Sequence, residues 1–369
     1  MRVLLAAGGS GGHIFPMVSL ASELEKNGVE DIYFIASRRR LDRNILAPSR
    51  HPCYFLSANP MPFGFKPVRS AVFAWKMAMD TASSAFLLGR LRPDVVVGFG
   101  GYSSGAAAAV AGLMRIPVVI HEQNLVPGRA NKILGRIADR VAVSFPETSR
   151  YFGSASDKVF YSGNPLRSDI LGKDRREGAE RLGLDPAVMT VLVMGGSQGS
   201  SFLNSTASRA ALLVKREEGN AVQFIHLTGR KDHGDVTRFY EENGLRGRVF
   251  SFLEGIDDAY AASDLAVSRA GAAAVFELAS YSRPMILVPY PNPANNQRHN
   301  AEYFAEAGAA VLKEERDLTP EDLAAEILGV IRDGQRRQRM ARAAGNLSVP
   351  EAGEKLAGEV MRIAARKRA

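Results

Sequence analysis

The chain has 369 residues, which is too long for one compact core and predicts two domains of ordinary size. Hydrophobic residues make up 46% and charged residues 23%, as in globular proteins, and the single cysteine, Cys53, excludes an intramolecular disulfide and fits a reducing cytoplasm. The formal net charge of +8 favours anionic partners, namely nucleic acid, anionic lipid headgroups or phosphorylated substrates. No zinc-finger, homeodomain or RNP pattern supports nucleic acid.

The N-terminal apolar run, Met1–Ala7, ends at Gly8 and Gly9. It is too short for the core of a signal peptide or for a membrane span, so we expect a buried first strand. No other stretch reaches ~18 uninterrupted apolar residues, and the sequence therefore predicts a protein that is not integral to a membrane.

Short apolar runs alternate along the chain with glycine-rich turns and amphipathic stretches. The predicted strand and helix pairs are, in chain order, Val3–Ala7 with Pro16–Lys26, Asp94–Val97 with Ser104–Met114, Pro117–His121 with Gly128–Ile137, Val191–Met194 with Phe202–Lys215, Val222–Leu227 with Asp232–Glu242, Leu265–Ser268 with Ala272–Ser280, and Pro284–Val288 with Asn295–Ala307. Apolar strands separated by helices indicate a parallel sheet covered on both faces. The predicted fold class is doubly wound α/β.

The pattern restarts in the second half, because the strand ending in Gly8–Gly12 resembles the strand ending in Gly195–Ser200. The turn-rich segment Tyr161–Pro165 lies between them and suits an interdomain hinge. We therefore predict a first domain over 1–163 and a second over 164–345. The remaining segment, 346–369, holds a last helix that could pack back on the first domain.

Three glycine-rich loops follow predicted strands, at Gly8–Gly12, Gly98–Gly105 and Gly195–Ser200. Glycines let backbone N–H groups approach an anion, and the N-terminus of the following helix adds partial positive charge. Tight turns also use glycine, but three such loops at strand ends favour a ligand crevice. The loops lack the full dinucleotide fingerprint, which weakens a nicotinamide cofactor, and no Walker A sequence is present.

Two further stretches carry candidate chemistry. His13 follows the first loop, where it is either a packed or capping residue or a general base near a sugar hydroxyl. At Ser268–Glu277 a strand ends and a helix begins near Ala272, so free N–H groups could hold a pyrophosphate. Glu277 could accept hydrogen bonds from a ribose diol, or it could be a solvated helix residue.

Two further segments give weaker evidence for a binding role. The amides of Tyr290–Gln297 suit sugar hydroxyls, although a polar loop would look similar. An apolar segment interleaved with cations is either an ordinary core helix or an interfacial patch that meets lipid headgroups. Its members are Phe63, Phe65, Val68, Val72, Phe73, Trp75, Met77 and Met79, with Lys66, Arg69 and Lys76.

Together these motifs resemble the MurG family, the UDP-N-acetylglucosamine:lipid I N-acetylglucosaminyltransferases of peptidoglycan synthesis. The resemblance runs along nearly the whole chain. The matching segments are GGSGGHIFP at Gly8–Pro16, GFGGYSSG at Gly98–Gly105, HEQN at His121–Asn124, GNPLR at Gly163–Arg167, GGSQGS at Gly195–Ser200, SRAGAAAVFELA at Ser268–Ala279 and NNQRHNA at Asn295–Ala301.

The resemblance implies a GT-B fold, with two Rossmann-like domains and a cleft between them, and the donor mainly on the second. It implies an inverting transfer of N-acetylglucosamine from UDP-N-acetylglucosamine to the C4 hydroxyl of lipid I (undecaprenyl-pyrophosphoryl-N-acetylmuramyl pentapeptide), giving lipid II and UDP. It further implies a peripheral enzyme on the cytoplasmic face of the bacterial inner membrane, docked through the first domain on an anionic surface, without nucleic acid. No cofactor is expected, and no metal, since no Asp-x-Asp signature appears. The alternatives are an enzyme like UDP-N-acetylglucosamine 2-epimerase and a non-catalytic nucleotide-sugar-binding subunit.

The resemblance also assigns residues. His13 is similar to the histidine suspected as base or acceptor-site residue, and Gln297 matches an amide that contacts the sugar. The family often has Gln-Gln or His-Gln where this chain has Asn296 and Gln297, and an acidic or amide residue at Ala294. The other matching positions are Ser10, Gly11 and Gly12 near the donor and acceptor phosphates, Asn124 and Arg167 at the donor, Ser197 beside the diphosphate, Leu253 at the uracil, and the helix start Ala272, Ala273, Ala274, Val275, Phe276 and Glu277, with Glu277 on the ribose.

Overall fold

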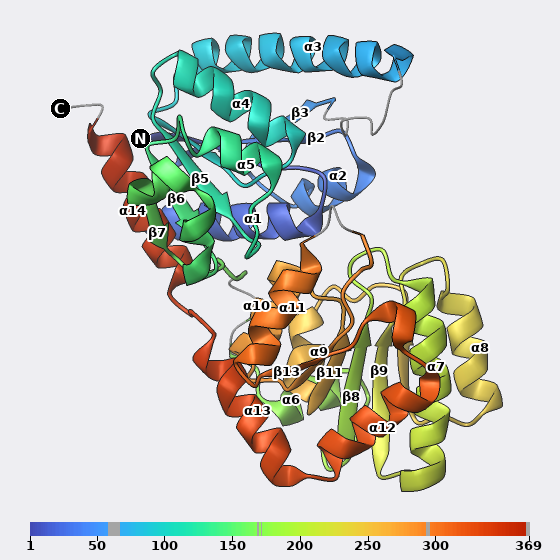
Figure 1. The fold of residues 1–369 in the computed structure, drawn as a ribbon. Coiled ribbons are helices and arrows are strands. Elements are labelled where there is room, and N and C mark those ends of the chain that lie inside the picture. The colour runs from blue at the N-terminus through green and yellow to red at the C-terminus, as the bar shows by residue number, and fades with distance from the viewer. Residues whose placement is uncertain (58–66, 168–169, 171, 293–295, 367–369) are drawn as a thin grey trace. The chain divides into compact units, whose positions relative to one another are not determined.

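The computed structural model describes residues 1–57, 67–167, 170, 172–292 and 296–366. The chain divides into two compact units, one of Met1–Arg167 with Val349–Ala369 and the other of Ser168–Ser348. Each unit is built on one parallel sheet with helices on its faces (Figure 1).

In the described part of the first unit, seven parallel strands lie in the order β3-β2-β1-β4-β5-β6-β7. The strands are β1 (Arg2–Ala6), β2 (Asp31–Ser37), β3 (Cys53–Leu56), β4 (Val95–Gly98), β5 (Val118–Glu122), β6 (Arg140–Val143) and β7 (Val159–Tyr161). The helices are α1 (Gly11–Lys26), α2 (Arg40–Leu46), α3 (Pro67–Leu91), α4 (Tyr102–Leu113), α5 (Arg129–Leu134) and α14 (Ala352–Arg366), with short 3-10 helices at Pro146–Tyr151 and Gly153–Lys158.

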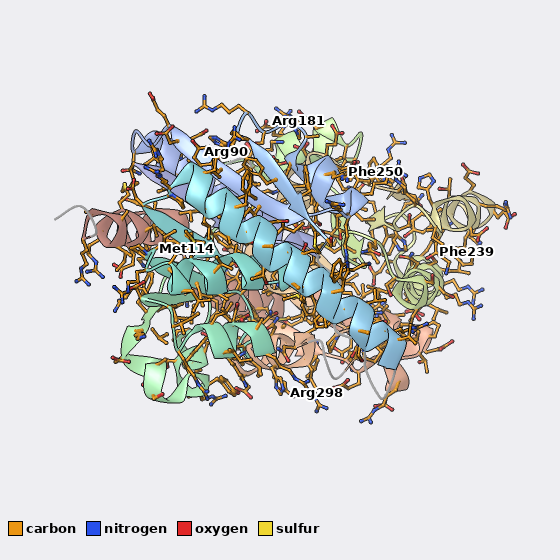
Figure 2. The ribbon with its side chains drawn as sticks, turned by 90° about the horizontal axis from the view of Figure 1, so that it is seen from above. Arg90, Met114, Arg181, Phe239, Phe250 and Arg298 are labelled. Atoms are coloured by element: carbon orange, nitrogen blue, oxygen red, sulfur yellow. The ribbon has the colours of Figure 1, made fainter. Side chains whose placement is uncertain are left out.

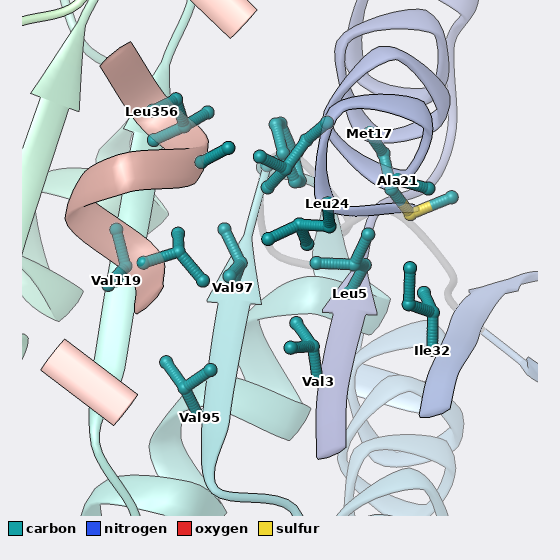
Figure 3. Packing of buried hydrophobic residues seen from close by; sticks show 14 of the residues in the cluster. Val3, Leu5, Met17, Ala21, Leu24, Ile32, Val95, Val97, Val119 and Leu356 are labelled. Carbon is teal, nitrogen blue, oxygen red and sulfur yellow. The ribbon is translucent and has the colours of Figure 1, made fainter. Parts of the chain in front are cut away.

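The central strands are mostly apolar, because both faces of the sheet are covered. Successive side chains point to opposite faces, so Val3 and Leu5 of β1 pack with α1 and α14, as Figure 3 shows. Leu4 and Ala6 pack on the other face with side chains of α3 and α4. Each large aliphatic side chain buried in this way contributes roughly 1.5–3 kcal/mol.

The C-terminal helix α14 belongs to the first unit. Its buried side chains recur at helical spacing, with Leu356, Val360 and Ile363 facing the core that contains α1. Two segments of this unit pass close to each other at Gly163 and Val349. At Gly163 φ is +82°, and an added Cβ would stand 2.6 Å from the Cβ of Val349. A glycine is therefore required at this position, close to where the chain leaves the first unit and later returns to it.

In the described part of the second unit, six parallel strands lie in the order β10-β9-β8-β11-β12-β13. The strands are β8 (Met189–Met194), β9 (Val222–Leu227), β10 (Gly247–Phe250), β11 (Leu265–Ser268), β12 (Met285–Leu287) and β13 (Ala310–Leu312). The helices are α6 (Arg175–Arg181), α7 (Ser201–Glu218), α8 (His233–Glu242), α9 (Ile256–Ala262), α10 (Ala272–Ser280), α11 (Gln297–Glu306), α12 (Pro320–Ile331) and α13 (Gly334–Asn346), with a 3-10 turn at Glu315–Asp317.

The predicted doubly wound α/β class is confirmed, and the bounds of β9, β11 and α10 are those expected. The expected start of the first helix is wrong, because α1 begins at Gly11 and Pro16 lies inside it. Proline has no N–H to bond to the carbonyl of Gly12, so the helix loses one hydrogen bond. The residues before Pro16 are nevertheless helical.

Candidate functional site

The predicted binding residues lie mainly in the loops that follow the strands. In a parallel sheet all carboxyl ends lie at one edge, so these loops gather there in each unit. Because each unit has its own sheet, the predicted residues form two groups, which are described separately.

In the first unit, the glycine loop after β1 packs directly on the loop after β4. Gly101, with φ +85°, lies so close to the carbonyl of Gly8 that an added Cβ would collide with it. Ser103 donates a hydrogen bond to the carbonyl of Ala7 at 2.9 Å. The two predicted loops Gly8–Gly12 and Gly98–Gly105 therefore form one rigid surface.

His13 lies on this surface in a defined tautomer. Its Nδ1 is 3.1 Å from the carbonyl oxygen of Gly8 and 3.3 Å from Oγ of Ser10. A carbonyl can only accept, so Nδ1 carries the proton and Nε2 keeps its lone pair in the neutral ring. An added Cβ at Gly100 would be 3.2 Å from Nε2, so the glycine leaves space beside this nitrogen. The ring is thus arranged as a proton acceptor.

Asn124 follows β5 and is held by a carboxylate that the sequence analysis did not single out. Oε1 of Glu122 accepts hydrogen bonds from the backbone N–H of Asn124 at 2.9 Å and from its side-chain amide at 3.2 Å. The other oxygen accepts from Gly128 N–H and from the Asn131 amide. Glu122 therefore fixes Asn124, and its place two residues earlier in the HEQN motif was the available signal.

Two other side chains of the first unit are fixed locally. His121 is buried, with Nε2 3.1 Å from the carbonyl of Gly163 and Nδ1 3.1 Å from the amide of Gln123. Burial lowers the pKa of His121 to about 4, so the ring is neutral. The guanidinium of Arg167 stacks 4.6 Å from the ring centroid of Phe15 in α1.

In the second unit, the glycine loop after β8 packs on the loop after β9. Gly199, with φ +77°, would collide with the carbonyl of Thr228 if it carried a Cβ. Ser197 is exposed at the turn of this loop. Ser200 ends the loop and caps α7, because its Oγ accepts from the N–H of Leu203 at 3.3 Å. The predicted phosphate loop is therefore rigid.

Helix α10 begins without a side-chain cap. Gly271 is its N-cap residue, and the first intrahelical bond runs from Val275 N–H to the Gly271 carbonyl at 3.1 Å. The N–H groups of Ala272, Ala273 and Ala274 precede that bond and have no acceptor within the helix. This end of α10 can accept an anion.

Gln297, the first residue of α11, faces the start of α10. Its Oε1 accepts from the backbone N–H of Tyr290 at 3.0 Å, and its Nε2 lies 4.0 Å from where a Cβ on Gly271 would stand. Asn296 is the N-cap residue of α11, whereas Asn295 and Ala294 lie outside the described residues. The structure thus brings Gln297 and Ala272–Glu277 together, and it places Leu253, half-buried after β10, at the same edge of the sheet.

Glu277 is not a solvated helix residue, so that interpretation is wrong. Glu277 is only 7% exposed, and its Oε2 accepts a hydrogen bond from the hydroxyl of Tyr260 at 2.7 Å. Tyr260 is fully buried and needs a partner for its hydroxyl. Sequence reasoning missed this pair, because Tyr260 lies on α9 and nothing local links it to α10.

Arg269 connects the loops of the second unit. Its guanidinium is buried and donates to the carbonyls of Val288 at 3.1 Å and Pro289 at 3.2 Å, and to Oγ of Ser200 at 2.6 Å. It also pairs with Glu315 at 2.5 Å. These partners come from the segments after β8, β12 and β13, while Arg269 itself follows β11, so one side chain holds four loops.

Comparison with known proteins gives a consistent result. The glycosyltransferase family 28 N-terminal domain matches residues 3–143, and the glycosyltransferase family 28 C-terminal domain matches residues 190–356. A UDP-N-acetylglucosamine–N-acetylmuramyl-(pentapeptide) pyrophosphoryl-undecaprenol N-acetylglucosamine transferase from Anaeromyxobacter dehalogenans is 38% identical, over 100% of this chain and 94% of the relative.

Solved structures agree on the fold. The crystal structure of Acinetobacter baumannii MurG is similar with a TM-score of 0.75 and 25% identity, over 98% of this chain and 100% of that one. A UDP-GlcNAc 2-epimerase from Neisseria meningitidis has a TM-score of 0.69 at 14% identity, over 98% and 100% of the two chains. The second likeness shows the fold alone.

The buried histidines predict how stability depends on pH. Burial lowers the pKa of His121 to about 4 and that of His226 to about 3, against an ordinary 6.5. Below about pH 6.5 the unfolded chain binds protons that the folded chain does not, so each histidine lowers the free energy of unfolding by up to about 1.4 kcal/mol per pH unit, down to about pH 4 for His121. Free energies of unfolding, measured by denaturant titration at several pH values in this window, should fall less steeply with decreasing pH for His121→Gln than for the unaltered chain. An unchanged slope would contradict the assignment.

Proposed function

Because this chain belongs to the family of UDP-N-acetylglucosamine–N-acetylmuramyl-(pentapeptide) pyrophosphoryl-undecaprenol N-acetylglucosamine transferases, we propose that it performs their reaction. It is a UDP-N-acetylglucosamine-dependent glycosyltransferase of peptidoglycan synthesis. The C4 hydroxyl of the N-acetylmuramyl group of lipid I attacks the anomeric carbon of the donor, with inversion, and lipid II and UDP leave. The observation that carries this conclusion is the full-length likeness to the named transferases.

The donor half of the site is proposed for the second unit. The free N–H groups at Ala272–Ala274 and the loop of Ser197 suit the diphosphate, and Glu277 suits the ribose diol. Leu253 would lie at the uracil and Gln297 at the sugar. As the bond to the anomeric carbon breaks, negative charge grows on the diphosphate, and the start of α10 stabilises it without rearranging.

The acceptor half is proposed for the first unit. His13 presents Nε2 as a base for the C4 hydroxyl, since its Nδ1 proton is held by the carbonyl of Gly8. Ser10, Gly11 and Gly12 would approach the phosphates through backbone N–H groups of the loop and of α1. Asn124 and Arg167, which the resemblance assigns to the donor, lie on this unit.

Helix α3 is proposed as the membrane-docking element. Its apolar side chains Val68, Trp75 and Phe86 are 76%, 68% and 67% exposed. With Val72 and Met79 they recur at spacings of three, four or seven residues, which places them on one face. Seen from above in Figure 2, α3 runs across the first unit in front of its other elements. The opposite face, with Asp80, Ser84 and Leu88, is buried. The interpretation of α3 as an ordinary core helix is therefore wrong for the exposed face.

Cations accompany this face. Arg69 is exposed and Lys76 is half-buried on α3, while Phe63, Phe65 and Lys66 lie outside the described residues. Apolar groups that dip into lipid together with cations that meet headgroups are typical of interfacial helices. None of the helices in the described ranges is both long and apolar enough to span a bilayer. From its exposed apolar face and its cations, we propose that α3 docks on the anionic cytoplasmic surface of the inner membrane, where lipid I is held by its lipid tail.

A transfer assay tests the function directly. Radiolabelled UDP-N-acetylglucosamine should label lipid in the presence of lipid I and not in its absence, with release of UDP. Release of an epimerised sugar without an acceptor would instead favour a 2-epimerase. A purified chain that binds the donor and transfers nothing would favour a non-catalytic subunit.

The pair formed by Glu277 and Tyr260 gives a graded prediction. Glu277→Ala should weaken UDP binding by roughly 1.5–3 kcal/mol, because the ribose loses a charged acceptor. Tyr260→Phe should weaken it less, since the carboxylate remains but loses the hydroxyl that orients it. Calorimetric titration with UDP measures both. Unchanged affinity for Glu277→Ala would remove this residue from the donor site.

His13 is tested by separating rate from binding. If Nε2 takes the proton of the acceptor hydroxyl, His13→Ala should lower kcat by ~10²–10⁴-fold with little change in donor affinity. A parallel loss of UDP binding would assign it a binding role, and a near-normal rate would dismiss it.

Docking through α3 predicts a dependence on charge. Arg69→Glu with Lys76→Glu should reduce binding to anionic liposomes at least about tenfold, because each cation near such a surface contributes about 1 kcal/mol. UDP affinity should not change. A matched variant, Arg339→Glu with Arg342→Glu on α13, makes the same change in net charge on exposed residues of the second unit. Flotation of the α3 variant at the level of the unaltered chain would refute docking through α3.

A further inference from the structure

Four arginines gather where β2 ends. Arg38, Arg39, Arg40 and Arg43, here called the arginine cluster, lie within six residues and are all exposed. Arg38 and Arg39 follow β2 directly, and Arg40 and Arg43 lie in α2. None of the four forms an ion pair with any residue in the described part of the chain.

The single acidic residue in this stretch does not neutralise the cluster. Asp42 is buried, and its Oδ2 accepts hydrogen bonds from the N–H of Gly9 at 3.1 Å, from the N–H of Ser37 at 3.2 Å and from the hydroxyl of Ser37. This carboxylate oxygen thus accepts from the glycine loop and from the end of β2. Like charges crowded on a surface repel one another, and an anionic ligand would relieve that repulsion.

The cluster spans the carboxyl ends of three neighbouring strands. Arg39 Nη1 donates to the carbonyl of Gly9, after β1, at 2.9 Å. On the other side, Arg38 Nε donates to the carbonyl of Phe55 in β3 at 3.3 Å, and the guanidinium of Arg43 lies 5.4 Å from the centroid of the Phe55 ring. Since β3, β2 and β1 are adjacent and strands lie about 4.8 Å apart, the cations extend over roughly 10 Å from the glycine loop outward.

We infer that the arginine cluster binds carboxylates of the acceptor's peptide. This rests on the proposed function, in which the acceptor carries a pentapeptide. A pyrophosphate is compact, and in the proposed function N–H groups of the glycine loop and α1 would bind it. The carboxylates of a peptide are spread along a chain, as the cations are. Guanidinium groups pair with carboxylates through two parallel hydrogen bonds. The cluster would thus help to select an acceptor whose peptide is anionic.

The test removes two of the four cations and spares Arg39, which contacts the glycine loop. A glutamine at position 38 keeps N–H donors that can serve the carbonyl of Phe55. Arg38→Gln with Arg40→Gln leaves Arg39 on Gly9 and Arg43 on Phe55. With a water-soluble, short-chain lipid I analogue, this variant should show an acceptor KM about three- to tenfold higher, in line with exposed ion pairs. The KM for UDP-N-acetylglucosamine and kcat should not change. Raising NaCl from about 50 to about 300 mM should raise the acceptor KM of the unaltered chain more than that of the variant.

Two controls separate the alternatives. Arg339→Gln with Arg342→Gln, exposed on α13, removes the same charge and should leave the acceptor KM unchanged. An analogue whose peptide carboxylates are all converted to carboxamides should bind the unaltered chain and the cluster variant equally. A difference that persists with this analogue would assign the cluster to the pyrophosphate and overturn the inference, as would an unchanged KM for the anionic acceptor.

Binding measured without turnover keeps the inference independent of the reaction. Calorimetric titration of the short-chain lipid I analogue with its anionic peptide, in the absence of UDP-sugar, should show that the cluster variant binds it about three- to tenfold more weakly than the unaltered chain. Equal affinities would overturn the inference even if transfer is normal. Absence of transfer by the unaltered chain, with the affinity difference intact, would refute the proposed function while leaving the carboxylate site supported.

Discussion

A guanidinium that is removed from water must find acceptors for its donors, and this requirement organises the second unit. Arg269 is buried at the end of β11, and its partners are Ser200, the carbonyls of Val288 and Pro289, and Glu315. Leaving any N–H donor of the Arg269 guanidinium unpaired would cost about 1–3 kcal/mol or more. The loops after β8, β12 and β13 are therefore held around the loop that leads into α10. The glycine loop and the start of α10 have a fixed relation because one side chain joins them.

The six described strands of the second unit follow the order of the first six strands of the first unit, but different side chains hold the two glycine loops. In the first unit a carboxylate, Asp42, accepts the N–H of Gly9, so this loop is fixed from behind by an anion. In the second unit a cation, Arg269, donates to Ser200 at the end of the loop. A positive charge near the end of the second loop suits the diphosphate of the proposed donor, whereas the first loop has the Asp42 carboxylate at the N–H of Gly9 and the Arg39 guanidinium at its carbonyl. In the proposed function, the same strand–loop–helix unit thus serves the nucleotide in one sheet and the acceptor in the other.

Sequence patterns predicted what depends on local order and missed what depends on distant packing. Continuous apolar runs gave the parallel sheets, and Gly271 before a run of alanines gave the start of α10 at Ala272. The support of Glu277 by Tyr260 depends on packing between α9 and α10, which the spacing of residues does not reveal, whereas the motif that contains both Glu122 and Asn124 offered a signal for their pairing. The mixture of apolar and cationic residues on α3 was compatible with a core helix or with an exposed one. The burial of Asp80, Ser84 and Leu88 shows which face of α3 packs on the unit and which face is exposed. The individual roles of the predicted site residues stay predictions.

If the proposed donor site depends on the loops that Arg269 joins, a conservative substitution of Arg269 should weaken donor binding. Arg269→Lys keeps the charge but cannot reach several acceptors through a planar fork, so the loops after β8, β12 and β13 would lose their common link. UDP titrated calorimetrically into this variant, with folding confirmed by circular dichroism, should bind at least about tenfold more weakly than to the unaltered chain. A folded Arg269→Lys variant that binds UDP with unaltered affinity would show that Arg269 does not organise a donor site.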